Sequence, residues 1–240
     1  GISRLTRDNI IAKSGKAIEA ASDADIILLD KTGTITEGNR AAIEFIPLDN
    51  FDVRCVAITS YLSSFNDNTR EGKSIIDLIE SMKIEIPDKI IDITLMSKPI
   101  EFNIKNRYSG IEISNPSKIM NYIKDEKICM KFMEILREYA TKGENIKILK
   151  GSVDALLPRI DNINKEEIEK IVRDIGEKGE TPLLLTINTK AVGIIVLKDR
   201  IKTGIKQVIS DLKVMGITPI MVTGDNPITA KVIANEAGID

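Results

Sequence analysis

The strongest constraint on the fold is a set of three apolar runs that each end in an aspartate. They are Ile26–Leu29, which precedes Asp30, "AVGIIVLKD", which ends at Asp199, and "ITPIMVTGD", which ends at Asp225. The first run lacks polar alternation, as is typical of strands covered on both faces. Helix-like segments, "IKTGIKQVISDLKVMG" and "PITAKVIANEAG", follow the second and third runs. This order predicts a parallel α/β sheet whose reactive groups gather at the carboxyl ends of strands.

The middle of the chain follows a different pattern. Helix-like stretches ("FDVRCVAITSYLSSF", "GKSIIDLIESMK") mix with short strands ("IEFNIK", "YSGIEIS", "NIKILKG"), and "PLLLTINTKAVGIIVL" predicts a hairpin that turns near residues 188–190. Residues 116–144 carry the longest helical signal. We therefore expect residues 40–194 to form a large α+β domain, inserted into an α/β domain of residues 1–39 and 195–240.

Composition narrows the possible functions. Histidine is absent among the 240 residues, which excludes Ser-His and Cys-His nucleophile pairs and His-ligated zinc. The formal net charge of -2 argues against nucleic acid as a partner. No apolar run approaches the roughly 20 residues that span a bilayer, and no signal peptide is recognisable. Cys55 and Cys129 lie far apart in helix-like surroundings, so we expect reduced thiols rather than a disulfide.

The string "DKTGT" at residues 30–34 is suited to phosphate chemistry. Asp30 ends a strand, where its carboxylate can attack a phosphoryl group to form an aspartyl-phosphate. Thr32, Gly33 and Thr34 offer hydroxyl and backbone N–H donors to phosphate oxygens, and Lys31 adds a positive charge, although strand alternation turns its side chain away. An Asp30 that only caps a turn is the structural alternative.

The residue two positions after the aspartate separates two kinds of enzyme. A hydrolase with an aspartyl nucleophile benefits from a second acid there, which protonates the leaving group and then activates water. This chain has Thr32, whose hydroxyl cannot do that work near neutral pH. We therefore expect a long-lived phosphoenzyme, as is useful when phosphorylation must drive another process.

A second segment, "MVTGDNPITAKVIA", is expected to approach Asp30. Thr223 and Gly224 end the predicted strand, Asn226 is suited to cap the next helix, and Pro227 is suited to the first helical position. A helix N-terminus directed at Asp30 would add backbone donors for a phosphate. An ordinary strand-to-helix connection is the alternative for this segment alone.

These motifs, taken together, resemble those of a known family. "DKTGT", followed nearly 200 residues later by "TGDN", resembles the catalytic region of P-type ATPases in the haloacid dehalogenase superfamily. The likeness is strongest to the catalytic B subunit of Kdp-type potassium-transporting ATPases, through "IAKSGKAIEAASDADIILLDKTGTITEGNR", "EGKSI", "RYSGIEI", "KGSVDA", "TPLLL", "VLKDRIKTGI" and "MGITPIMVTGDN". The resemblance implies a partial Rossmann-like phosphorylation domain with an inserted nucleotide-binding domain.

The resemblance also implies site residues. Asp30 matches the residue that takes the γ-phosphate of ATP, and the backbone carbonyl of Thr32 is expected to help Asp30 hold Mg²⁺. Phe102 matches the aromatic that stacks on adenine. The surrounding phosphate site is expected to include Lys31, Thr223, Gly224 and Asp225, and the nucleotide site Glu71, Ser109, Lys150, Gly151 and Asp199.

Three features depart from the family pattern. Glu101 stands where the family more often has proline, residues 116–144 lengthen a connection that is usually short, and the chain stops at Asp240, before the family's GDGxNDxP segment. The long helical segment is expected to be a lid, a partner surface or a tolerated insertion. We expect a fragment that acts at the cytoplasmic membrane face and has little or no turnover alone.

The implied partners are ATP, Mg²⁺, the actuator domain and membrane helices of the intact protein, and other subunits of a Kdp-type complex. Two alternatives stay open: a stand-alone phosphatase of the same superfamily, which would use Asp30 on small phosphate esters, and a non-enzymatic ATP-binding module. Thr32 and the inserted domain weigh against the phosphatase.

Overall fold

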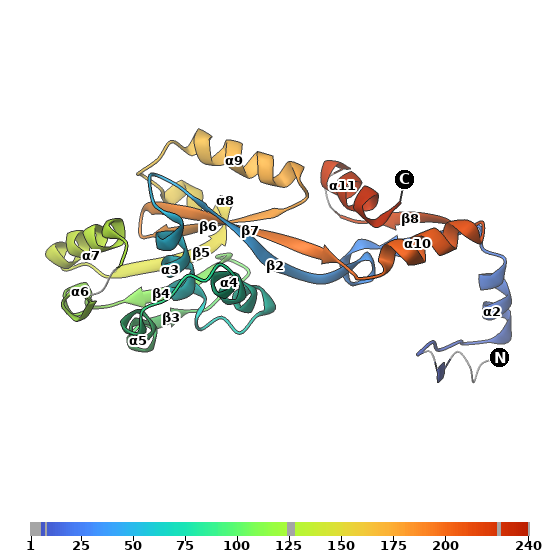
Figure 1. The fold of residues 1–240 in the computed structure, drawn as a ribbon, viewed down its shortest axis with the longest axis horizontal. Helices are drawn as coiled ribbons and strands as arrows, with labels where there is room; N and C mark the ends of the chain where they lie inside the picture. The colour runs from blue at the N-terminus through green and yellow to red at the C-terminus, as the bar shows by residue number, and fades with distance from the viewer. Residues whose placement is uncertain (1–5, 8, 124–127, 225–226, 240) are drawn as a thin grey trace. The chain divides into compact units, whose positions relative to one another are not determined.

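The computed structural model describes residues 6–239 except residue 8 and the segments 124–127 and 225–226. Contacts divide the chain into two compact units, one of Gly1–Gly38 with Ile201–Asp240 and one of Asn39–Arg200. The first contains a parallel sheet and the second an antiparallel sheet covered by helices (Figure 1). The expected α/β fold with a large inserted α+β part is confirmed. None of the helices within the described ranges is long and apolar enough to cross a membrane.

The first unit is built on two parallel strands. Strand β1 (Ile26–Asp30) pairs with β8 (Thr218–Val222), so that Asp30 lies beside Val222 at their carboxyl ends. The unit also contains the helices α2 (Gly15–Ser22), α10 (Ile205–Val214) and α11 (Pro227–Ala237). One face of the two strands, with Leu29 and Met221, packs onto a small core of residues from α10, α11 and their surroundings.

The prediction that the first apolar run is buried on both faces is wrong. Ile26 and Leu28 are 57% and 66% exposed, and Ile220 and Val222 on the same face of β8 are exposed too. Apolar composition identified the strand correctly, but burial depends on a second covering layer. Among the described residues, none provides that layer.

The second unit is a six-stranded sheet in the order β2-β7-β6-β5-β4-β3, with antiparallel pairing from β3 to β7. Its strands are β2 (Thr36–Pro47), β3 (Lys98–Ile100), β4 (Tyr108–Ile113), β5 (Ile146–Ser152), β6 (Thr181–Ile187) and β7 (Lys190–Ile201). Its helices are α3 (Val53–Ser64), α4 (Arg70–Ser81), α5 (Asp88–Met96), α6 (Pro116–Ile123), α7 (Met130–Lys142), α8 (Val153–Leu156) and α9 (Lys165–Glu177).

Helices cover both faces of this sheet, α3 on one and α8 and α9 on the other (Figure 1). The covering explains why β7 is apolar without alternation. Val192 and Ile195 join the core under α3, whereas Ala191 and Ile194 join the core under α8 and α9. We predicted that this run, which ends at Asp199, lies in the parallel sheet. That assignment is wrong, because a continuous apolar run indicates burial on two faces without indicating the direction of its neighbours.

The hairpin predicted around residues 188–190 is confirmed. Strands β6 and β7 pair directly across it, with Ile187 opposite Lys190. Asn188 adopts a left-handed conformation (φ +50°), and its side-chain oxygen accepts a bond of 2.7 Å from the backbone N–H of Lys147. Asparagine tolerates this conformation better than most residues, so the local sequence specifies the turn.

Residues 116–144, predicted as one long helical signal, form two helices. Helix α6 ends at Ile123, and α7 begins at Met130 after its N-cap residue Cys129. Helix α7 ends at Lys142, and the next residue, Gly143, takes the left-handed conformation common after helices (φ +68°). Their shared apolar periodicity reflects two helices that contact each other and turn apolar stripes toward the same core.

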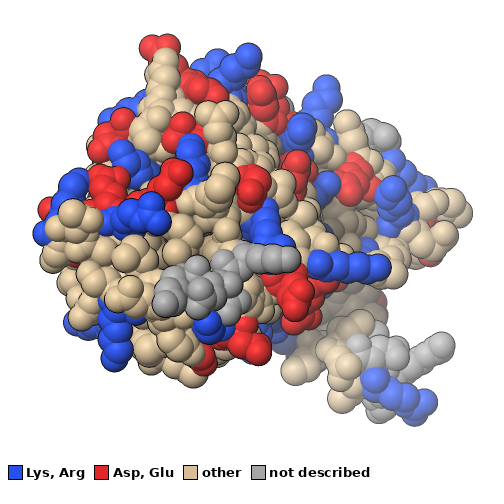
Figure 2. Space-filling view, turned by 60° about the vertical axis from the view of Figure 1, so that its left-hand side comes forward, with Lys and Arg blue, Asp and Glu red and all other residues tan. Residues whose placement is uncertain are grey.

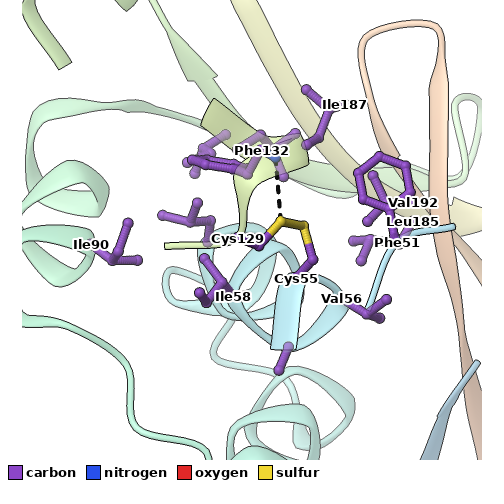
Figure 3. Packing of buried hydrophobic residues seen from close by; sticks show 14 of the residues in the cluster. Phe51, Cys55, Val56, Ile58, Ile90, Cys129, Phe132, Leu185, Ile187 and Val192 are labelled. Carbon is purple, nitrogen blue, oxygen red and sulfur yellow. Dashed lines mark hydrogen bonds between the residues drawn. A yellow bond between two sulfur atoms is a disulfide. The ribbon is translucent and has the colours of Figure 1, made fainter. Parts of the chain in front are cut away.

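The expectation of reduced, separate thiols is also wrong. Cys55 near the start of α3 and Cys129 before α7 form a disulfide, with their Cα atoms 5.3 Å apart (Figure 3). The two cysteines are 74 positions apart, and the sequence between them does not predict this distance, which results from the packing of both segments into one core.

Candidate functional site

A cavity of about 360 Å³ lies in the antiparallel-sheet unit. It is bounded by the end of α3, the loop before α4, the end of β3 and the start of β4. Its volume lies within the range of small-molecule sites. Two of the expected nucleotide residues, Phe102 and Ser109, line it, together with Asp67, Asn68 and Gly110.

Phe102 lies in a loop, not in the strand predicted from "IEFNIK". Strand β3 ends at Ile100. The backbone N–H of Arg107 then donates to the carbonyl of Asn103 (2.8 Å), and the N–H of Asn106 donates to the Asn103 side chain (2.7 Å). Asparagine competes for backbone donors in this way and ends extended structure. The loop leaves the Phe102 ring 60% exposed at the cavity, where a flat ligand could cover it.

Lys150 is placed by β5 and is held by a carboxylate that the sequence did not indicate. It lies opposite Ser109 in the β4–β5 register and is only 2% exposed. Its ammonium forms a hydrogen-bonded salt bridge with Asp67, whose side chain is 14% exposed. The backbone N–H of Thr69 also donates to Asp67 (3.0 Å). The pair ties the loop before α4 to the sheet, and so fixes one wall of the cavity.

The pKa values of two acids near Lys150 are shifted in opposite directions. Burial raises the pKa of Asp67, but hydrogen bonds from Lys150 and Thr69 and the charge of Lys150 outweigh it, so the pKa lies below its ordinary value. Burial raises the pKa of Glu71 above its ordinary value, and the charges of Lys150 and Arg40 only partly oppose this effect. Asp67 is therefore the ion-pair partner of Lys150, whereas Glu71 is a partly desolvated acid beside the pair.

Close backbone approach explains two glycines at this site. A Cβ on Gly110 would lie 1.9 Å from the carbonyl oxygen of Ile148 on β5. A Cβ on Gly151 would lie 2.5 Å from the Cβ of Tyr108 on β4. Gly110 lines the cavity and Gly151 follows Lys150, so the two glycines allow β4 and β5 to meet closely beside the ion pair.

In the parallel-sheet unit, Asp30 ends β1 with its side chain exposed. Strand β8 ends at Val222, so Thr223 and Gly224 follow the strand and do not end it as predicted. Because Asp30 lies beside Val222, these two residues follow at the same edge of the sheet. The structure therefore brings these three expected residues to one place. Asp225 lies outside the described residues.

The loop after Asp30 is a tight turn with buried ends and an exposed middle. Lys31 and Ile35 are buried, whereas Thr32, Gly33 and Thr34 between them are exposed. Gly33 takes a positive φ of +81°, which suits glycine. The ammonium of Lys202 donates to the carbonyl of Gly33 (2.5 Å), and its backbone N–H donates to that of Ile35 (3.0 Å).

Sequence reasoning missed Lys202 and Asp67. The segment "IKTGIKQVISDLKVMG" was predicted to be helix-like, and nothing in it indicated that its first lysine contacts residues 33–35. "DNT" before a helix is a local signal for a turn and cap, which Thr69 confirms by accepting a bond of 3.0 Å from the Gly72 N–H. The pairing of Asp67 with Lys150 had no sequence signal. Asp199 lies half-buried near the end of β7.

The distribution of charged side chains on the surface does not indicate a further binding site. Lys and Arg side chains are interspersed with Asp and Glu over the face drawn in Figure 2, in keeping with the nearly balanced composition of 34 basic and 36 acidic residues. The concave sites above therefore carry the functional argument.

Comparison with known proteins agrees with the fold and the motifs. Residues 24–240 match the family model of haloacid dehalogenase-like hydrolases. The chain belongs to this family. Within it, the chain is similar to the catalytic region of P-type ATPases. Over its whole length it is 41% identical to the potassium-transporting ATPase ATP-binding subunit of Clostridium perfringens, and 40% identical to that of Caldanaerobacter subterraneus.

The chain spans 31% of the length of these relatives. Solved structures show the same fold at low identity. A zinc-transporting PIB-type ATPase in the E2.Pi state superposes with a TM-score of 0.63 at 19% identity, covering all of this chain and 32% of the other. The catalytic domain of a CPx-ATPase superposes with a TM-score of 0.56 at 14% identity, covering all of this chain and 70% of the other.

Proposed function

We propose that this chain is the ATP-binding and phosphorylation region of a P-type ATPase that transports K⁺. The observation that carries the proposal is the pairing of two sites in one chain: an exposed Phe102 at a cavity, and an exposed Asp30 at the carboxyl edge of a parallel sheet. The first is suited to a flat base and the second to a phosphoryl group. Residues Gly1–Gly38 with Ile201–Asp240 would be the phosphorylation domain, and Asn39–Arg200 the nucleotide-binding domain.

In the nucleotide-binding domain, ATP is the ligand and adenine stacks on Phe102. Ser109 lies across the same cavity and supplies a hydroxyl. Lys150 and Asp67 hold the loop that forms one wall. Glu71 and Gly151 support this arrangement next to Lys150. Stacking of a base on an aromatic ring contributes roughly 1–3 kcal/mol, so Phe102 is expected to contribute measurably to the affinity for ATP.

In the phosphorylation domain, Asp30 is the nucleophile. One carboxylate oxygen bonds to the γ-phosphorus while the bond from that phosphorus to the β–γ bridging oxygen breaks, and ADP leaves with the electron pair. Thr32, Thr223 and Gly224 lie around the carboxylate and donate to phosphoryl oxygens, with Asp225 following them in sequence. Lys202 holds the turn through the carbonyl of Gly33.

Mg²⁺ fits the oxygen atoms that this edge of the sheet presents. The Asp30 carboxylate is a ligand type that Mg²⁺ prefers, and the Thr32 carbonyl is a second oxygen two residues away; water completes such sites. A bound Mg²⁺ would neutralise phosphate charge during transfer. Thr32 provides no acid–base group, which favours a phosphorylated Asp30 that persists rather than one that is rapidly hydrolysed.

The proposed role in ion transport is based on the similarity to the relatives. They are described as potassium-transporting ATPase ATP-binding subunits, and this chain spans 31% of their length. In the intact protein we place Asp30 on the cytoplasmic side of the membrane, where its phosphorylation drives a conformational change in membrane helices and other subunits. The chain alone then binds ATP with little or no turnover. Asp199, near the end of β7, is proposed to contact the nucleotide.

A nucleotide titration by calorimetry tests the proposal. Phe102→Ala weakens ATP binding about tenfold, as expected from lost stacking. Ile104→Ala is the matched control, since Ile104 lies in the same loop, is 88% exposed and does not line the cavity; it leaves the affinity unchanged. Asp30→Asn also leaves binding nearly unchanged.

Equal affinities for Phe102→Ala and the unmodified chain would contradict the nucleotide site. Multiple turnovers on a generic phosphate ester by this chain, lost in Asp30→Asn, would instead favour the stand-alone phosphatase. If this chain binds ATP but Asp30 is never phosphorylated by ATP in the intact protein, the remaining interpretation is a non-enzymatic ATP-binding module.

A further inference from the structure

The disulfide joins two parts of the nucleotide-binding unit that are 74 residues apart. Cys55 lies in the first turn of α3, and Cys129 is the residue just before α7. Figure 3 shows the bridge within the apolar core, where the backbone N–H of Phe132 donates to the Cys129 sulfur (3.3 Å). The bridge therefore fixes the point at which α7 begins.

The two cysteine residues differ in access from solvent. Cys55 is fully buried, whereas Cys129 is 8% exposed and lines an open cavity of about 680 Å³ that Cys55 does not line. Two basic side chains, Arg54 and Lys131, and two acidic ones, Asp52 and Glu134, also line this cavity. Their charges balance, so an approaching thiolate meets no excess of like charge. We therefore expect a thiol from solvent to reach Cys129 rather than Cys55.

Helix α7 has other attachments that survive loss of the bridge. Phe132, Leu136 and Tyr139 are buried in the core. The ammonium of Lys131 lies 3.3 Å from the Asp49 carboxylate and 4.5 Å from the centre of the Phe51 ring. Reduction therefore removes a covalent link at the start of the helix while leaving the rest of its packing in place.

We propose that Cys55 and Cys129 form a reversible thiol–disulfide site, addressed by dithiols at Cys129, that sets the local stability of α7. A thiolate of the dithiol bonds to the Cys129 sulfur, the sulfur–sulfur bond breaks, and Cys55 leaves with the electron pair and takes a proton. The second thiol then attacks the reductant's own bound sulfur and releases Cys129. Two electrons pass to the protein, and the dithiol becomes a cyclic disulfide.

Single-cysteine variants test the direction of attack. Cys55→Ala leaves the thiol of Cys129, and Cys129→Ala leaves that of Cys55. With an aromatic disulfide reagent under native conditions, Cys129 reacts at least tenfold faster than Cys55. Equal rates, or a faster Cys55, overturn the assignment of Cys129 as the accessible sulfur. Circular dichroism checks that both variants are folded.

Unmodified protein reduced with dithiothreitol tests the structural consequence without a substitution. Reduction proceeds faster than global unfolding, and the Phe132 amide then exchanges hydrogen at least tenfold faster than in the oxidised chain. The amide of Leu184, on β6 away from the bridge, exchanges at an unchanged rate. Reoxidation restores the original protection. Reduction that occurs only as fast as global unfolding, or an unchanged Phe132 amide, overturns the proposal.

Discussion

The buried ion pair between Lys150 and Asp67 gives the sharpest energetic prediction. Lys150 is 2% and Asp67 14% exposed, so either charge alone would be held away from most of its water. Removing one partner of such a pair costs about 3–5 kcal/mol. We therefore expect Lys150→Met, and separately Asp67→Asn, to lower the free energy of unfolding by about that amount at pH 7.

The double variant, Lys150→Met with Asp67→Asn, separates the interaction between the two charges from the cost of burying each charge alone. With both charges removed, the loss should be about 1 kcal/mol or less, because uncharged pairs replace buried ion pairs at little cost. The combined effect then falls short of the sum of the single effects by at least about 5 kcal/mol, well above the usual error of additivity. Urea denaturation followed by circular dichroism measures all four free energies.

The matched control is Lys142→Met, which breaks a 2.7 Å pair with Glu138 on the surface of α7. Exposed pairs contribute little, so no clear loss is expected. If Lys150→Met is as mild as Lys142→Met, or if the single effects simply add, the buried pair does not hold the loop. Because the pKa of Asp67 is lowered, the pair's contribution is present near neutrality and is lost as the pH falls below about 4.

Three further changes have defined outcomes. Glu71→Gln raises the free energy of unfolding at pH 7, because the raised pKa of Glu71 means that its ionised form is disfavoured in the folded state. This gain in stability shrinks as the pH falls through that pKa. A gain that does not depend on pH would contradict the reasoning. Gly110→Ala lowers stability by about 1–3 kcal/mol, because the added Cβ clashes with Ile148. Gly176→Ala, in α9 with open space around it, raises stability by about 0.5–1 kcal/mol. Thermal unfolding of both variants measures these two changes. Phe132→Ala costs about 3–5 kcal/mol in urea denaturation, and a loss below 1 kcal/mol would show that its ring is not packed as described.

Much of the architecture could be predicted from local patterns. The strand before Asp30, the hairpin at Asn188 and the helices after Asp199 and Gly224 follow from apolar patterns and turn residues, which act over a few residues. The tight turn after Asp30 was predictable for the same reason, because the string "DKTGT" is local.

The errors came from properties that depend on the fold as a whole. Whether Ile26 and Leu28 are buried depends on a second layer, and whether β7 is parallel depends on its neighbours. The disulfide of Cys55 with Cys129 likewise required the packing of distant segments. The pairing of Lys150 with Asp67 across 83 residues had no counterpart in the sequence pattern.

The most direct test of the nucleotide site is an ATP titration followed by the backbone amide resonances of this chain. The cavity beside Phe102 predicts shifts that cluster in residues 66–69 and 101–110, with saturation at one common affinity. Shifts that cluster instead around Asn50–Arg54 and Cys129–Glu134, where the larger cavity lies, would contradict the account. So would an ATP titration that leaves Phe102, Ser109 and Gly110 unmoved.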